Sequence, residues 1–170
     1  LGDVYKRQEV DIANGTLTIN TNRANGANTG GNITIAKTVY GNSDESLVLD
    51  AHSAGSGTIS LGPVGASTSQ IAGITATAEG GITLNGNIIT SDAGTGITFN
   101  DDVIIADGKS ITITTNSGNT DGGVTFGGSI SGVGGTDATN GTSENLTIDS
   151  GTGNVSTVSY THLTLPTTIE

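Results

Sequence analysis

Aliphatic and polar residues alternate in short runs along most of this chain, and Gly, Asn or Asp interrupts the runs every few positions. Such alternation is typical of short β-strands with one buried and one exposed side. The interrupting residues are those that tight turns favour. Helix signals are nearly absent, so the pattern predicts an all-β protein.

One short pattern recurs along the chain. It consists of Gly, an aliphatic residue, Thr or Ser, and then an aliphatic residue or Phe, with a further aliphatic residue about four positions later. Complete copies begin at Gly31, Gly57, Gly81, Gly96 and Gly123, and a sixth begins at Gly153. Fixed strands separated by variable loops are typical of stacked coils.

A second family of strands precedes most copies of this pattern. Its members are Leu17–Ile19, Leu47–Leu49, Ile74–Ala76, Ile111–Ile113 and Leu146–Ile148. The starts of these strands are 30, 27, 37 and 35 residues apart. The 37-residue interval, from Ile74 to Ile111, contains an additional copy of the first pattern, at Ile97.

If each coil stacks on the next, equivalent residues form ladders. We expect one internal ladder of Leu17, Leu47, Ile111 and Leu146. A second internal ladder is expected to contain Ile33, Ile59, Ile82, Ile97 and Val124, with Ile35, Leu61, Leu84, Phe99 and Phe126 beside it. The residues between these, Thr34, Ser60, Thr83, Thr98 and Thr125, are expected to form an outward polar ladder.

These ladders predict a right-handed parallel β-helix (a β-solenoid), whose coils stack on further repeats of the same chain. The alternative is a tandem of antiparallel β-sandwich repeats. A longer period of about 95 residues relates Leu17–Asn22 to Ile111–Asn116 and Glu45–Asp50 to Glu144–Asp149. This period is also a common sandwich length. The strand pattern repeats inside that period and core aromatic residues are scarce, which favours the β-helix.

The two ends of the chain differ from the rest. Residues 1–8 (LGDVYKRQ) and 158–167 (VSYTHLTLPT) match translations of transposon-end sequencing adaptors in opposite orientations, and 168–170 would be index sequence. Such segments are excluded from fold arguments. We therefore expect 1–8 and 158–170 to be adaptor-derived, and 9–157 to be a β-solenoid repeat segment of a longer protein.

Charge and composition narrow the function classes. The formal net charge is −11, with only 5 Lys and Arg. Because basic residues supply most nucleic-acid affinity and attract anionic membranes, neither partner is expected. No apolar run approaches the ~20 residues of a membrane helix, so no direct membrane insertion of this segment is expected. The absence of Cys excludes disulfides and thiolate metal sites.

Candidate catalytic chemistry is sparse. Glycoside hydrolysis needs two carboxylates at a defined separation, and Asp101 and Asp102 are the only adjacent acids besides Asp44 and Glu45. At a corner these are ordinary turn residues. We predict no catalytic and no cofactor-binding residue, so the chain is not expected to be an enzyme. A β-helix polysaccharide-active enzyme is kept as an alternative.

Calcium is the other alternative, since carboxylates in Gly- and Asn-rich turns suit this cation. The metal candidates are Asp101 and Asp102, and further turn acids are Asp92, Asp107 and Asp121. Solvated turn acids are the favoured interpretation, because no EF-hand loop or glycine-rich nonapeptide is present. His52 has no partner His or Cys nearby in the sequence, so no metal role is expected for it.

Two stretches, ISLGPVGASTSQIAGITATAEGGITLNGNIIT (Ile59–Thr90) and ENLTIDSGTGNVST (Glu144–Thr157), resemble the repeats of filamentous-haemagglutinin-like bacterial adhesins. The likeness is one of repeat texture and covers 9–157. It implies a right-handed β-helix stalk, exported by a two-partner or autotransporter route to the bacterial surface or released outside the cell. From the repeated Thr, Asn and Ser ladders we also expect weak multivalent contacts with host or neighbouring cells, glycans or matrix. We therefore expect a structural, adhesive segment.

Overall fold

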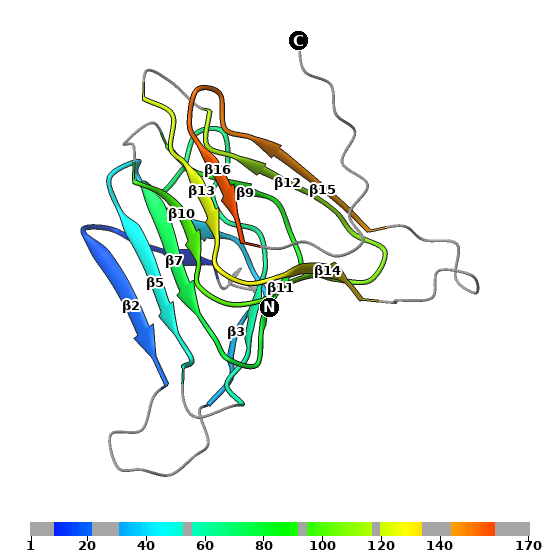
Figure 1. Ribbon diagram of the computed structural model, residues 1–170. Helices are drawn as coiled ribbons and strands as arrows, with labels where there is room; N and C mark the ends of the chain where they lie inside the picture. The colour runs from blue at the N-terminus through cyan, green and yellow to red at the C-terminus, as the bar shows by residue number, and fades with distance from the viewer. Residues whose placement is uncertain are drawn as a thin grey trace, which may run out of the picture.

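The computed structural model describes residues 9–21, 31–52, 56–91, 95–116, 120–133 and 144–158. Within them every secondary-structure element is a β-strand, and every strand pair is parallel (Figure 1). Residues 1–8 and 159–170, which make up nearly all of the predicted adaptor-derived ends, lie outside this part of the chain. Parallel pairing confirms the parallel β-helix and excludes the antiparallel sandwich.

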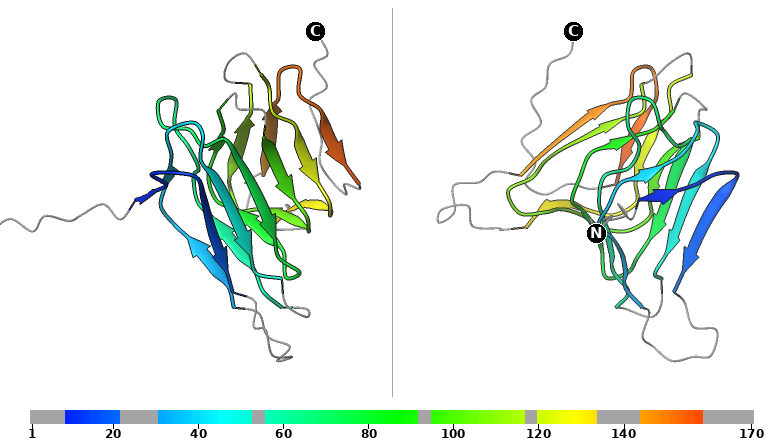
Figure 2. Two further views of the ribbon diagram at one scale, coloured as in Figure 1. Left: turned by 90° about the vertical axis from the view of Figure 1, so that its left-hand side faces the viewer. Right: turned by 180° about the vertical axis from the view of Figure 1, so that it is seen from behind.

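The first face of the solenoid is a six-stranded sheet. Its strands, in spatial order, are β2 (Thr16–Asn20), β5 (Ser46–Asp50), β7 (Gly73–Thr77), β10 (Gly96–Phe99), β13 (Val124–Phe126) and β16 (Val155–Thr157). Each strand pairs with its equivalent one coil later. One aliphatic position of the strand therefore repeats in register from Leu17 in β2 to Val155 in β16. Figure 2 shows the strands of this sheet side by side along the length of the solenoid.

The second face is a five-stranded sheet that follows the first face in every coil. It contains β3 (Ile33–Ile35), β6 (Ile59–Leu61), β8 (Ile82–Leu84), β11 (Val103–Ile105) and β14 (Ile130–Gly132). In each strand the first residue is buried and the middle residue is at least partly exposed. This burial pattern is what period-2 alternation requires of a sheet with one wet side.

The strands of the third face are shorter in the early coils than in the later coils. It comprises β1 (Val10–Asp11), β4 (Val39–Tyr40), β9 (Ile88–Ile89), β12 (Ser110–Thr114) and β15 (Asn145–Asp149). The early strands are two residues long, and Val64 links β4 to β9 by single parallel bridges. β12 and β15 instead pair over five residues.

The three faces enclose one dry interior. Ile33, Ile82 and Val124 are all buried and belong to the same hydrophobic cluster, which runs through the described coils. Phe99 and Phe126 are also buried within it, and their ring centroids lie 5.5 Å apart in a tilted arrangement. The predicted single core is confirmed.

The predicted composition of the ladders was partly wrong. Leu17 and Leu47 lie on the first face, whereas Ile111 and Leu146 pair on the third face. Ile33, Ile59 and Ile82 form a ladder on the second face, whereas Ile97 and Val124 pair on the first face. The additional copy of the repeat at Ile97 shifts the later repeats by one face. Since every strand has the same apolar alternation, local sequence did not reveal this shift.

Candidate functional site

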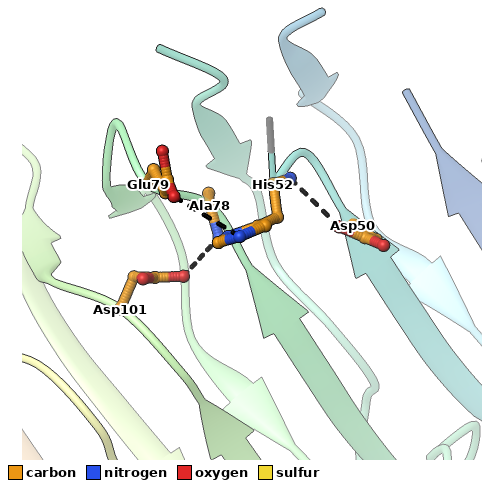
Figure 3. A network of polar contacts seen from close by, with 5 residues as sticks. All are labelled: Asp50, His52, Ala78, Glu79 and Asp101. Carbon is orange, nitrogen blue, oxygen red and sulfur yellow. Dashed lines mark hydrogen bonds and ion pairs between the residues drawn. The ribbon is translucent and has the colours of Figure 1, made fainter. Parts of the chain in front are cut away.

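The corner between the first and second faces gathers polar side chains from successive coils. We call it the acidic corner and define it as Asp50, His52, Glu79, Asp101 and Asp102, together with the backbone at Ala78. Figure 3 shows these residues except Asp102. β5, β7 and β10 deliver these residues, because each strand ends at this corner and the coils are stacked in register. Asp101 and Asp102 were predicted from the sequence as turn acids, whereas their neighbours at this corner were not predicted.

Asp101 holds two coils together. Its Oδ2 accepts a hydrogen bond of 2.7 Å from the backbone N–H of Ala78, one coil earlier. In the same corner, Asp50 Oδ1 accepts from the backbone N–H of His52 at 3.0 Å, and Nε2 of His52 lies 3.4 Å from Oε1 of Glu79 (Figure 3). His52 therefore has a carboxylate neighbour, although it has no second His or Cys for a metal site.

Asp102 makes the equivalent link in the other direction. Its Oδ1 accepts hydrogen bonds from both the backbone N–H and the hydroxyl of Ser129, at 2.7 and 2.8 Å, one coil later. These bonds lower the pKa of Asp102, with the backbone N–H of Ser129 as the largest cause. A Cβ on Gly128 would lie 2.4 Å from the backbone N of Asp102 and 2.6 Å from the same Oδ1, so only glycine fits beside this contact.

A second carboxylate shows the same chemistry outside the acidic corner. Asp121 Oδ2 accepts from the backbone N–H and the hydroxyl of Thr152, each at 2.7 Å, and these bonds lower the pKa of Asp121. Asp121 and Thr152 occupy equivalent places before β13 and β16, as Asp102 and Ser129 do before β11 and β14. Recognising Ser129 and Thr152 from sequence required the true coil spacing, which the shift at Ile97 concealed.

Glu45, from the adjacent pair Asp44 and Glu45, stabilises a turn. It is 4% exposed and lies in the turn between β4 and β5. Its Oε2 accepts from the backbone N–H of Asn42 at 2.5 Å. Ser43 within this turn has a positive φ of 82°, and its backbone N–H donates to Gln70 O at 2.9 Å. The carboxylate thus closes a tight corner.

The four described turn acids that were considered for calcium lie at separate places in the fold. Asp101 and Asp102 follow β10, Asp107 lies in the turn after β11, and Asp121 precedes β13. Asp92 lies outside the described residues. Among the described residues, no three His, Asp or Glu side chains are grouped closely enough to hold a metal ion. Three of the described acids, Asp101, Asp102 and Asp121, instead accept hydrogen bonds from backbone N–H groups of neighbouring coils.

The outward side of the first face carries a regular row of mostly hydroxyl side chains. In register from coil to coil these are Thr18, Val48, Thr75, Thr98, Thr125 and Ser156. Their spacing follows the strand separation of ~4.8 Å. Polar residues border this row, where Asn20 donates to Asp50 and Asn100 donates to Thr77. Such a surface presents weak hydrogen-bonding groups at a fixed repeat.

Comparisons with known proteins identify no relative. No family model, curated protein or solved structure matches this chain. In the described part of the chain, no helix has the length and apolar character needed to span a membrane.

Proposed function

We propose that this chain is a non-catalytic stalk segment of a large, exported bacterial surface adhesin. The observation that supports the proposal best is the continuous parallel stacking of coils around one core, which makes the segment a stiff spacer. The resemblance of Ile59–Thr90 to adhesin repeats gives the class. An extracellular position at the bacterial surface follows from that class.

The outward row from Thr18 to Ser156 supports an adhesive contribution. Single hydroxyls bind weakly because they exchange one set of hydrogen bonds with water for another. A row repeated on many coils and many copies gains strength by multivalency. The proposed partners are glycans or matrix on host or neighbouring cells. The carboxylates that an enzyme would use instead accept backbone hydrogen bonds, as at Asp101 and Asp102.

The test compares single and multiple display. The full chain is immobilised at high density on beads and presented to panels of glycans, matrix proteins and epithelial cells, while the free chain is tested on the same panels. We expect bead binding, with free-chain binding at least 100-fold weaker. Absence of bead binding across all panels would refute the adhesive part of the proposal.

Two triple variants locate the contact. Thr75→Asp, Thr98→Asp and Thr125→Asp together place charges on the first face and should abolish bead binding. The matched control changes Thr34, Ser60 and Thr83 to Asp. These residues lie on the outward side of the second face, so this variant should retain binding. Equal loss of bead binding in both variants would indicate that added negative charge, and not a specific face, prevents binding.

The alternatives are tested on the same protein. Incubation with acidic and neutral polysaccharides, with and without calcium, is followed by the appearance of new chain ends. Product formation that disappears in Asp101→Asn or Asp102→Asn would replace the stalk proposal with a polysaccharide-active enzyme. For a calcium-stiffened rod, chelation would lower the Tm, and an unchanged Tm removes that alternative.

A further inference from the structure

A single histidine lies among the carboxylates of the acidic corner. His52 is the only His in the part of the chain that the structure describes. Its Nε2 lies 3.4 Å from Oε1 of Glu79 (Figure 3). Because His is the side chain whose charge ordinarily changes between pH 5 and 8, this contact gains a positive partner for the carboxylate as the pH falls.

The contact joins two successive coils, the second and the third, which begin with β5 and β7. Asp50 of β5 pairs in register with Thr77 of β7. His52 and Glu79 each lie two residues later, so they occupy equivalent places in the two coils. The backbone between them is held by hydrogen bonds. Ala51 N–H donates to Thr77 O at 2.9 Å, and His52 N–H donates to Oδ1 of Asp50.

The charged groups that surround His52 are all acidic among the described residues. Within its own coil, Asp50 accepts from the backbone N–H of His52 at 3.0 Å. From the later coils, Asp101 accepts from the backbone N–H of Ala78 at 2.7 Å. On the opposite side, residues 20–21, at and just after the end of β2, carry no charge.

Asp102 adds a further carboxylate on the other side of Glu79. Phe99 of β10 pairs in register with Ala76 of β7. Asp102 and Glu79 each lie three residues later, so these two carboxylates occupy equivalent places in adjacent coils. Like charges in such places weaken the pairing of neighbouring strands. Both described lysines follow strands of the second face, β3 and β11, and so lie at the far corner of that face.

We propose that His52 and Glu79 form a link between the second and third coils that mild acid strengthens. At pH 8 an imidazole is ordinarily neutral and does not offset the repulsion between Glu79 and Asp102. At pH 5.5 the protonated imidazole of His52 attracts Glu79 and offsets that repulsion. The inference goes beyond the proposed function and does not depend on adhesion.

Solvent exposure limits the strength of this link. The side chain of His52 is 51% exposed and that of Glu79 is 33% exposed. An ion pair at such a place changes a local opening equilibrium by about 1.5-fold to 5-fold. Salt screens the attraction between the two charges, so the change should be smaller at high salt than at low salt.

Amide exchange at two pH values tests the link in the full chain. The wild type and Glu79→Gln are compared at pH 5.5 and at pH 8 by hydrogen–deuterium exchange, with peptides that cover 46–52 and 73–79. Comparison at one pH removes the dependence of the chemical exchange rate on pH. The ratio of exchange rates, Glu79→Gln to wild type, should be about 1.5-fold to 5-fold larger at pH 5.5 than at pH 8. The same ratio at both pH values overturns the proposal.

Two histidine variants identify the group that titrates. In a His52→Asn background, Glu79→Gln should change the exchange rates by the same factor at both pH values. His162→Asn is the matched control, because this second His lies outside the described residues, and it should keep the wild-type response to pH. A response that persists without His52, or that disappears without His162, overturns the proposal.

A third variant tests general charge repulsion. The net charge of −11 means that mild acid also reduces repulsion throughout the chain. Asp107→Asn removes one carboxylate from an exposed turn after β11, away from the acidic corner. Its exchange rates relative to the wild type should not depend on pH between 5.5 and 8. If they change as those of Glu79→Gln do, the specific link is refuted. Circular dichroism verifies the fold of each variant.

Discussion

The repeats before and after Ser91 share a local sequence but occupy different faces. Ile82–Leu84 forms β8 on the second face, and Ile97–Phe99 forms most of β10 on the first face. Both follow a glycine of positive φ, 95° at Gly81 and 72° at Gly96. The same pattern of Gly-Ile-Thr and an apolar residue thus fits either face.

The two glycines differ in how closely neighbouring backbone atoms approach them. Gly96 lies in register between Gly73 and Gly123, and a Cβ on Gly96 would come within 2.4 Å of Gly123 O. A Cβ on Gly81 would meet a side-chain methyl, Cδ1 of Ile104, at 3.3 Å. Close backbone approach at the start of β10 therefore requires glycine in three consecutive coils, whereas the start of β8 is less crowded.

The interior differs between the two regions as well. At the same ladder position on the first face, the early coils have Ile19, Leu49 and Ala76, and the later coils have Phe99 and Phe126. The small Ala76 lies beside the large Phe99. The comparison shows that one solenoid accepts different side-chain volumes along its length when neighbouring coils compensate.

The largest expected effect comes from Phe99. Phe99→Ala leaves a cavity beside Phe126 and should reduce the free energy of unfolding by about 3–5 kcal/mol. Phe99→Leu retains most of the volume and should cost about 1 kcal/mol. Urea unfolding followed by circular dichroism measures both. A loss below about 1 kcal/mol for Phe99→Ala would show that the later coils are not packed around this pair.

The next effect sharpens the glycine comparison. Gly96→Ala combines a left-handed backbone with the clash against Gly123 O, and should cost roughly 3 kcal/mol. Gly15→Ala is the matched control, because Gly15 has a φ of 71° but no atom within 4 Å of its Cβ position. It should cost about 1 kcal/mol. Equal losses of thermal stability in both variants would contradict the close approach.

Amide exchange compares the two regions of the third face. The five-residue pairing of β12 with β15 should protect its amides at least tenfold more than the two-residue pairing of β1 with β4. Hydrogen–deuterium exchange with peptide-level mass spectrometry makes this measurement. Equal protection would mean that opening of this face is cooperative along the whole rod.

The smallest expected effect concerns pH. The pKa of Asp102 is lower in the folded chain than in the unfolded chain, so its ionised form stabilises folding above its ordinary pKa. That contribution is lost as pH falls below about 5 and through the folded pKa. For this exposed group it should be below about 1 kcal/mol. Asp102→Asn should flatten the dependence of Tm on pH between 2 and 5.

A matched variant separates this effect from net charge. Asp107→Asn removes the same charge from an exposed turn and should retain the wild-type slope of Tm against pH. Equal flattening in both variants would show that general charge repulsion, and not the bonds from Ser129, controls the acid response.

Much of the fold follows from sequence alone. Alternation of aliphatic and polar residues predicted strands, recurrence predicted coils, and the two Phe residues were correctly placed inside. These properties depend on which side of a strand is apolar, and neighbouring residues in the sequence contain that information. The turn location of Asp101 and Asp102 was predictable for the same reason.

Only the tertiary structure decided which face each strand occupies and which residues the acids bind. The face of Ile97, the link from Asp102 to Ser129 and the link from Asp121 to Thr152 all depend on residues about one coil away. Coil lengths vary because the loops vary, so equivalent residues are not at a constant separation in the chain. The contacts that choose between faces are backbone approaches and side-chain volumes between coils, and these exist only once the coils have stacked.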